Sequence, residues 1–217
     1  MRPERLVLVT GTGTEVGKTW VACALARALR ARGLVVAARK PVQSFGPDDP
    51  SAGTDAAVLA EATGEHPGVV CPRHRWYAVA MAPPMAAEVL GRPPFSVADL
   101  ADEVAWPPGV GVGLVESAGG VRSPLAADGD TATLAAALRP ERVVLVADAG
   151  LGTINAVRLS AAALAPWPVT VLLNRYDAGD ELHQANRAWL AGRDGYDVAT
   201  DAAGLVAPIV GWPAQPA

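Results

Sequence analysis

The 217-residue sequence has little of what defines several large classes of protein. It contains only two cysteines, which exclude a disulfide framework and indicate a reducing compartment such as the cytoplasm. No run approaches the roughly 20 apolar residues that a membrane-spanning helix needs, and the start of the chain lacks the anatomy of a signal peptide. We therefore expect a cytoplasmic protein without a membrane segment.

Basic residues are outnumbered by acidic ones, and lysine is almost missing. The net charge of −4 argues against a nucleic acid or an anionic membrane surface as partner. Of the 18 basic residues, only Lys18 and Lys40 are lysines. Because an ammonium is compact and a guanidinium is planar, a lysine kept in an arginine-rich chain indicates a site where arginine does not fit.

Apolar residues are abundant, and their pattern alternates between strands and helices. They make up 51% of the chain, mostly as Ala, Val and Leu, enough for the core of one domain spanning residues 1–217. Short apolar runs predict strands at 5–10, 34–38, 110–115, 143–147 and 169–173, and one further strand within 204–217. Helical periodicity and capping residues predict helices at 19–32, 54–63, 83–90, 131–138, 154–164 and 181–190.

This alternation predicts an α/β fold with a mostly parallel central sheet and helices on both faces. Ligands of such sheets gather at the carboxyl ends of the strands. The loops that follow the strands are therefore the place to look for chemistry.

The loop after the first strand reads Gly11-Thr-Gly-Thr-Glu-Val-Gly-Lys-Thr19 and opens a helix. Its glycines allow backbone N–H groups to face phosphate oxygens, Lys18 can reach the terminal phosphates, and the Thr19 hydroxyl can bind Mg²⁺. Five residues separate Gly11 from Gly17, one more than in the common P-loop. The stretch predicts a P-loop NTPase that binds ATP, although the loop alone does not distinguish ATP from GTP.

Polar residues follow several other strands. Lys40 ends the second strand, and Glu116 occupies the place where P-loop enzymes carry an acid that reaches Mg²⁺. Asp55 is explained equally well as a helix-start residue. The Gly-rich turn at 148–155 opens a helix and is a candidate anion site, while Asn174 can read a base edge or cap a turn.

Taken in order, these segments resemble the dethiobiotin synthases. The resemblance rests on the loop at 11–19, with its five-residue gap, and on Lys-Pro-Val-Gln-Ser at 40–44. It extends over residues 6 to about 175 through Thr54-Asp55, Met81-Ala-Pro83, Glu116-Ser-Ala-Gly-Gly120, Leu151-Gly-Thr-Ile-Asn155 and Asn174.

The resemblance implies a role for each matching residue. Lys40 and Lys18 would be catalytic, and Thr19, Asp55 and Glu116 would bind Mg²⁺. The substrate would contact Ser44 and the turn of Gly152, Thr153, Ile154 and Asn155, which takes the carboxylate tail from the neighbouring subunit of a homodimer. ATP would be bound, with Asn174 recognising the base, by Gly13, Thr14, Glu15, Val16, Gly17, Lys18, Thr19, Trp20, Asp55, Glu116, Ser117, Ala118, Gly119, Asn174 and Arg175.

The implied activity is that of a ligase in biotin biosynthesis, with ATP as cosubstrate and Mg²⁺ as cofactor. 7,8-Diaminopelargonate takes up CO₂ as a carbamate, ATP phosphorylates the carbamate, and the second amine closes the ureido ring. The route requires no protein nucleophile, and the sequence places no base near either cysteine.

The chain departs from the family pattern at three positions and near its end. Ser117 and Phe45 stand where glycine is usual or common, and Ala156 replaces a frequent histidine. The base-contacting segment expected near 205–213 is not recognisable. These departures bear on nucleotide preference and on the fit of the substrate.

Two other functions are compatible with parts of the pattern. An amide-forming P-loop ligase of cobyrinate type usually carries a glutaminase domain, for which the chain has no room. A nucleotide switch of the partitioning or septum-positioning type usually has an additional lysine early in the loop, and residues 11–16 contain none.

Overall fold

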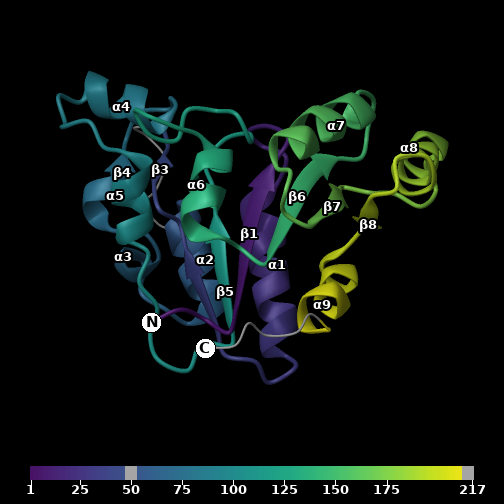
Figure 1. The fold of residues 1–217 in the computed structure, drawn as a ribbon, viewed down its shortest axis with the longest axis horizontal. Helices are drawn as coiled ribbons and strands as arrows, with labels where there is room; N and C mark the ends of the chain where they lie inside the picture. Colours follow the sequence, from purple (N-terminus) through teal and green to yellow (C-terminus); the bar gives the residue numbers. More distant parts are fainter. Residues whose placement is uncertain (47–52, 212–217) are drawn as a thin grey trace.

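The computed structural model describes residues 1–46 and 53–211, and it confirms the α/β fold (Figure 1). Six strands form one sheet in the order β2-β5-β1-β6-β7-β8, and every neighbouring pair is parallel. The strands are β1 (Arg5–Gly11), β2 (Val36–Arg39), β5 (Val112–Glu116), β6 (Arg142–Asp148), β7 (Val169–Asn174) and β8 (Asp197–Ala199).

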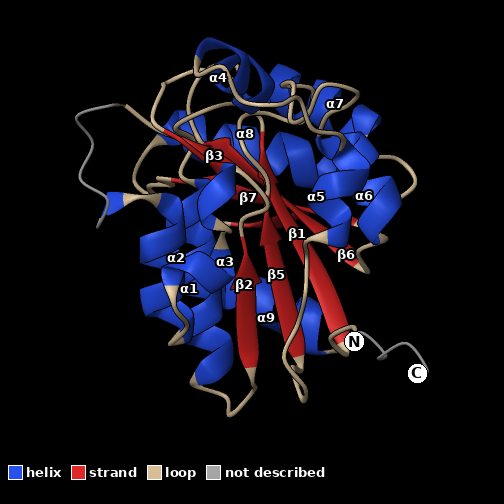
Figure 2. Ribbon diagram, turned by 90° about the vertical axis from the view of Figure 1, so that its left-hand side faces the viewer, coloured by secondary structure: helices blue, strands red, loops and turns tan. Residues whose placement is uncertain are grey.

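Helices cover both faces of the sheet (Figure 2). One face packs against α1 (Lys18–Arg30), α2 (Asp55–Thr63), α3 (Pro67–Val70) and α9 (Ala202–Val210). The other packs against α4 (Pro83–Val89), α5 (Val97–Asp102), α6 (Thr131–Leu138), α7 (Thr153–Ala163) and α8 (Glu181–Gly192). The sheet is thus sandwiched, as a parallel sheet requires.

The strands divide their side chains between two apolar cores. In β1, Leu6 and Leu8 face the α4–α8 side, while Val7 and Val9 face the α1–α9 side. Successive side chains of a strand point to opposite faces, and here both faces are buried. This explains why the strands read as uninterrupted apolar runs in the sequence.

A second, two-stranded parallel sheet was not predicted. It consists of β3 (Gln43–Ser44) and β4 (Trp76–Tyr77), with Ser44 paired to Tyr77. The backbone N–H of Phe45 donates to the carbonyl of Tyr77 at 3.0 Å, which extends the pairing by one residue. This small sheet fixes the path of the chain just after Lys40.

The end of the chain differs from the sequence prediction. The prediction of a strand within 204–217 is wrong for the described residues. Residues 202–210 form α9, and the last strand of the sheet, β8, precedes it. The Asp201 carboxylate caps α9 by accepting from the N–H of Gly204, and Leu205, Val206 and Ile209 are spaced to bury one helical face. Residues 212–217 lie outside the described part of the structure.

Candidate active site

The phosphate-binding loop links β1 to α1, as the sequence predicts. Gly17 is the N-cap of α1 and has a φ of 94°, in the left-handed region that favours glycine. Lys18, the first residue of the helix, is buried, and its ammonium donates to the carbonyl of Gly13 at 2.8 Å. Burial, together with the nearby Lys40 ammonium, lowers the pKa of Lys18 to about 8.

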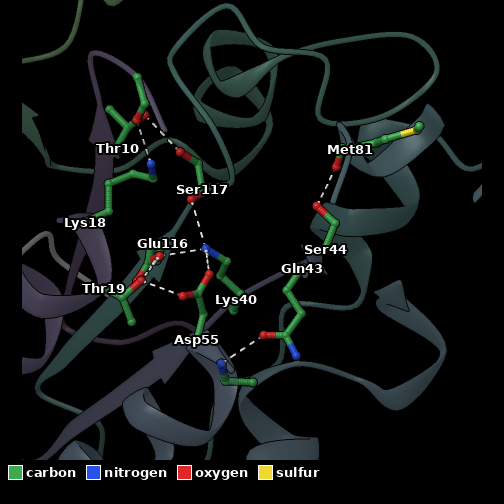
Figure 3. A network of polar contacts seen from close by, with 12 residues as sticks. Thr10, Lys18, Thr19, Lys40, Gln43, Ser44, Asp55, Met81, Glu116 and Ser117 are labelled. Atoms are coloured by element: carbon green, nitrogen blue, oxygen red, sulfur yellow. Dashed lines mark hydrogen bonds and ion pairs between the residues drawn. The ribbon is translucent and has the colours of Figure 1, made fainter. Parts of the chain in front are cut away.

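Three oxygen-bearing side chains meet beside this loop (Figure 3). They come from the first turn of α1, the start of α2 and the end of β5. The hydroxyl of Thr19 lies 2.8 Å from Oδ1 of Asp55 and 2.9 Å from Oε1 of Glu116. Two carboxylates and a hydroxyl, far apart in the sequence, thus form one compact cluster of oxygen atoms.

Lys40 lies against the same two carboxylates. Its Nζ is 2.7 Å from Oδ2 of Asp55 and 2.6 Å from Oε1 of Glu116, and it donates to the carbonyl of Ser117 at 3.2 Å. Burial alone would lower the pKa of Lys40, but the two carboxylates outweigh it and hold that pKa above its ordinary value. The Lys40 ammonium in turn holds the pKa of Asp55 below its usual range, whereas burial raises the pKa of Glu116.

These groups line a cavity of about 1050 Å³. It contains twelve of the sequence-predicted site residues: Thr14, Glu15, Gly17, Lys18, Thr19, Lys40, Ser44, Asp55, Glu116, Ala118, Gly119 and Arg175. The structure therefore gathers most of the predicted nucleotide and metal residues around one space.

Other predicted residues lie beside the cavity rather than in its lining. The Nδ2 of Asn174 donates to the carbonyl of Val16 at 2.9 Å, so this side chain contacts the phosphate-binding loop directly. The Ser117 hydroxyl points away from the cavity and donates to the Thr10 hydroxyl at 2.9 Å, so the serine at this usual glycine position is accommodated inside the fold. The Trp20 side chain is mostly exposed on α1.

The turn at 152–155 stands apart from this cavity, since none of its residues contributes to the lining. Gly152 is the N-cap of α7 with a φ of 91°, and Asn155 is exposed. The hydroxyl oxygen of Thr153 is buried without a hydrogen-bond partner in the described structure. Leu151, which precedes the turn, is 91% exposed.

The sequence interpretation missed several residues of the site. The Oε1 of Gln43 accepts from the N–H of Ala56 at 2.9 Å, which anchors the first turn of α2 and so places Asp55. Phe45, Met81 and Pro83 line the far end of the cavity, where the Ser44 hydroxyl donates to the Met81 carbonyl at 2.6 Å. The signal was present in the sequence: Gln43, Met81 and Pro83 belong to the motifs at 40–44 and 81–83, and Phe45 directly follows the first of these, but none was assigned a role.

Both cysteines are buried in the structure. Burial raises the pKa of Cys23 and of Cys71 to about 12, so both thiols stay protonated at neutral pH. Within residues 1–46 and 53–211, no helix is both long and apolar enough to cross a membrane.

Comparisons with known proteins agree with this geometry. A protein-family model described as an AAA domain matches residues 5–186. The chain is 43% identical to the ATP-dependent dethiobiotin synthetase BioD of Caulobacter sp. (strain K31), over 76% of this chain and 72% of that protein. It is 42% identical to the protein of the same name from Anaeromyxobacter dehalogenans (strain 2CP-C), over 82% and 79%.

Solved structures support the fold. The signal recognition particle receptor FtsY from Elizabethkingia anophelis superposes with a TM-score of 0.52 at 17% identity, over 91% of this chain and 57% of that chain. Such low identity speaks for the fold alone. From the identity and coverage of the relatives above, this chain belongs to the family of ATP-dependent dethiobiotin synthetases.

Proposed function

We propose that this chain closes the ureido ring of dethiobiotin from 7,8-diaminopelargonate and CO₂, with ATP as the energy source. One observation carries the proposal: the phosphate-binding loop, two carboxylates and a buried lysine share a single cavity. Such a set can hold a triphosphate and neutralise the charge that gathers when a phosphoryl group is transferred.

The triphosphate of ATP fits the loop of residues 13–19. Its backbone N–H groups and the N-terminus of α1 favour anions, and Lys18 adds a point charge. Ala118 and Gly119 face the same space from the β5 side. The base would lie toward Asn174 and Arg175, at the end of β7.

The oxygen ligands fit Mg²⁺. This ion prefers oxygen ligands and uses one or two carboxylates together with phosphate oxygens and water. Thr19, Asp55 and Glu116 supply such a set. The second carboxylate oxygen of Glu116, Oε2, is buried and has no hydrogen-bond partner among residues 1–46 and 53–211. When bound there, Mg²⁺ would neutralise charge on the terminal phosphates of ATP.

Lys40 is the residue we assign to the carbamate. Its ammonium is held charged by Asp55 and Glu116, and because it is buried, water screens its attraction for the carbamate oxygens only weakly. One amine first attacks CO₂ and releases a proton to form the carbamate; a carbamate oxygen then attacks the γ-phosphorus and ADP leaves. Positioning and charge neutralisation suffice for this transfer.

Ring closure then needs the second amine next to the activated carbonyl. Its nitrogen attacks the carbamate carbon, the bond to the phosphate oxygen breaks, and phosphate leaves with its electron pair while the amine releases a proton. Ser44 lies at this end of the cavity, next to Phe45 and Met81, whose apolar surfaces suit the methylene chain of the substrate.

The carboxylate tail of the substrate would bind in a homodimer. The turn of Gly152, Thr153, Ile154 and Asn155 opens α7 and suits an anion, yet it does not line this chain's own cavity. A neighbouring copy would bring that turn to the open end of the cavity. The exposed Leu151 beside it supplies apolar surface for such a contact.

The remaining expectations belong to the same proposal. We place the activity in one domain spanning residues 1–217, in the cytoplasm, and acting on small molecules. The net charge of −4 favours no nucleic-acid or anionic-membrane partner.

An assay of phosphate release tests the proposal. Purified protein with Mg²⁺ and ATP should release phosphate only when both the diamine and bicarbonate are present, and mass spectrometry should detect dethiobiotin in equal amount. Omitting either substrate is the internal control. Turnover that ignores the diamine but rises with DNA or lipid vesicles would favour a nucleotide switch instead.

A further inference from the structure

Two neighbouring residues at the end of β7 hold two consecutive carbonyl groups of the phosphate-binding loop. The Nδ2 of Asn174 donates to the carbonyl of Val16 at 2.9 Å, and Nη2 of Arg175 donates to the carbonyl of Glu15, also at 2.9 Å. Asn174 is 8% exposed, so little water competes for its hydrogen bond. The loop follows β1, and these hydrogen bonds tie it to the end of β7, which lies two strands away from β1 in the sheet.

The backbone at these contacts is in a conformation that most residues avoid. Glu15 and Arg175 are non-glycine residues with φ values of 62° and 57°, and Gly17 has a φ of 94°. Left-handed residues within such a loop turn N–H groups toward an anion and leave carbonyls facing outward. A non-glycine residue keeps this conformation only where its surroundings enforce it.

The packing around Asn174 is equally tight. A Cβ atom on Gly17 would lie 2.1 Å from Nδ2 of Asn174, so the amide rests directly on the loop backbone. Arg175 is oriented from its other side, since its Nη1 lies 3.0 Å from Oδ2 of Asp148. The other oxygen of Asp148 accepts from the N–H of Gly150 at 2.9 Å. Asn174 therefore contacts the loop from a buried position, and Arg175 contacts it while paired with Asp148.

We propose that Asn174 and Arg175 are positioning residues that preform the phosphate-binding loop, whatever contact either makes with the base. The inference rests on the proposed nucleotide site and adds a task to it. The two side chains hold the carbonyls of Glu15 and Val16 outward, and this conformation of the loop sets its affinity for the phosphates. A ligand that has the triphosphate but no base should therefore bind more weakly when either side chain is removed.

Calorimetry with two ligands tests this idea. We would titrate ATP and the Mg²⁺ complex of inorganic tripolyphosphate into the wild-type protein, Asn174→Ala and Arg175→Met. Each variant removes one hydrogen bond to the loop, so the affinity for both ligands should fall by a similar factor, roughly three- to tenfold. A role confined to the base would change ATP binding alone.

Thr170→Ala is the matched control. Thr170 is also a buried polar residue of β7, but it lies at the opposite end of the strand, where its hydroxyl donates to Oδ2 of Asp197 at 2.9 Å. This variant should lower the melting temperature without changing the affinity for tripolyphosphate. The control thus separates a general loss of stability from a specific effect on the phosphate-binding loop.

The outcomes are distinct. An unchanged tripolyphosphate affinity in both variants overturns the inference, whether or not ATP binds more weakly. If Asn174→Ala does not fold, Arg175→Met decides the matter, because the Arg175 side chain is 61% exposed and its loss should be tolerated. A wild-type protein that binds neither ligand would instead contradict the proposed function.

Discussion

The Nζ of Lys40 and a carboxylate oxygen of Glu116, Oε1, are 2.6 Å apart, and that same oxygen lies 2.9 Å from the hydroxyl of Thr19. One oxygen is therefore shared between the proposed catalytic cation and the proposed metal ligands. A substitution of Lys40 or of Glu116 should therefore affect both metal binding and catalysis.

Replacing Lys40 should abolish most of the ring-closing activity. A guanidinium in Lys40→Arg keeps the charge but is too large and planar for a fully enclosed position between two acids. Loss of a well-placed charge stabiliser typically slows a reaction roughly a hundred- to a thousandfold. Phosphate release by Lys40→Arg and Lys40→Ala checks this, and turnover within a few-fold of wild type would contradict it.

The same lysine should matter for stability when Mg²⁺ is absent. Lys40→Ala leaves the buried Glu116 and the partly exposed Asp55 without their cation, and breaking a buried ion pair such as Lys40–Glu116 costs about 3–5 kcal/mol. We expect a lower melting temperature in chelator that rises when Mg²⁺ is added. An unchanged melting temperature in chelator would show that the pair is not electrostatically important.

Glu116→Gln should weaken the dependence of ATP binding on Mg²⁺. The amide keeps the shape of the side chain but removes one of the two carboxylate charges near Thr19. Calorimetric titration of ATP with and without Mg²⁺ measures the effect, with Asp55→Asn as the companion variant. If both variants keep the wild-type Mg²⁺ dependence, the ligand assignment is wrong.

ATP binding should take up a proton at alkaline pH. Burial and Lys40 lower the pKa of free Lys18 to about 8, and bound phosphates favour its charged form and raise that pKa again. Above about pH 8, affinity should therefore fall as pH rises, because the free protein has lost a proton that the complex retains. Binding enthalpies measured at about pH 9 in two buffers with different enthalpies of ionisation give the number of protons taken up. Identical binding enthalpies in the two buffers would refute the prediction.

Mixed dimers should recover activity if two subunits build one site. An inactive Lys40→Ala protein and an inactive variant of the Gly152–Asn155 turn would be mixed and allowed to exchange subunits. Dimers containing one of each should regain part of the wild-type activity, since one of their two sites is intact. Light scattering that shows an active monomer would exclude the arrangement.

Local chemistry in the sequence was enough to predict the sheet and the phosphate-binding loop. Five of the six strands of the main sheet were predicted as apolar runs, because a strand buried on both faces has little choice of residue. The loop from Gly11 to Thr19 was recognisable because phosphate binding constrains glycine, lysine and threonine at fixed spacing. The short strand β8 and the helix α9 were missed, because their signals are brief and lie in a diverged region.

The sequence also identified Lys40, Asp55 and Glu116 as separate candidates, each with its own local explanation. Only the tertiary structure decided that they touch. Sheet order places the ends of β2 and β5 side by side, which joins Lys40 to Glu116, and the hydrogen bond from Ala56 to Gln43 anchors the start of α2, which brings in Asp55. It likewise decided that the Ser117 hydroxyl turns inward to Thr10 and that Asn174 holds the carbonyl of Val16. Residue type and spacing determine local chemistry, whereas the direction and partner of a side chain depend on packing between segments distant in the chain.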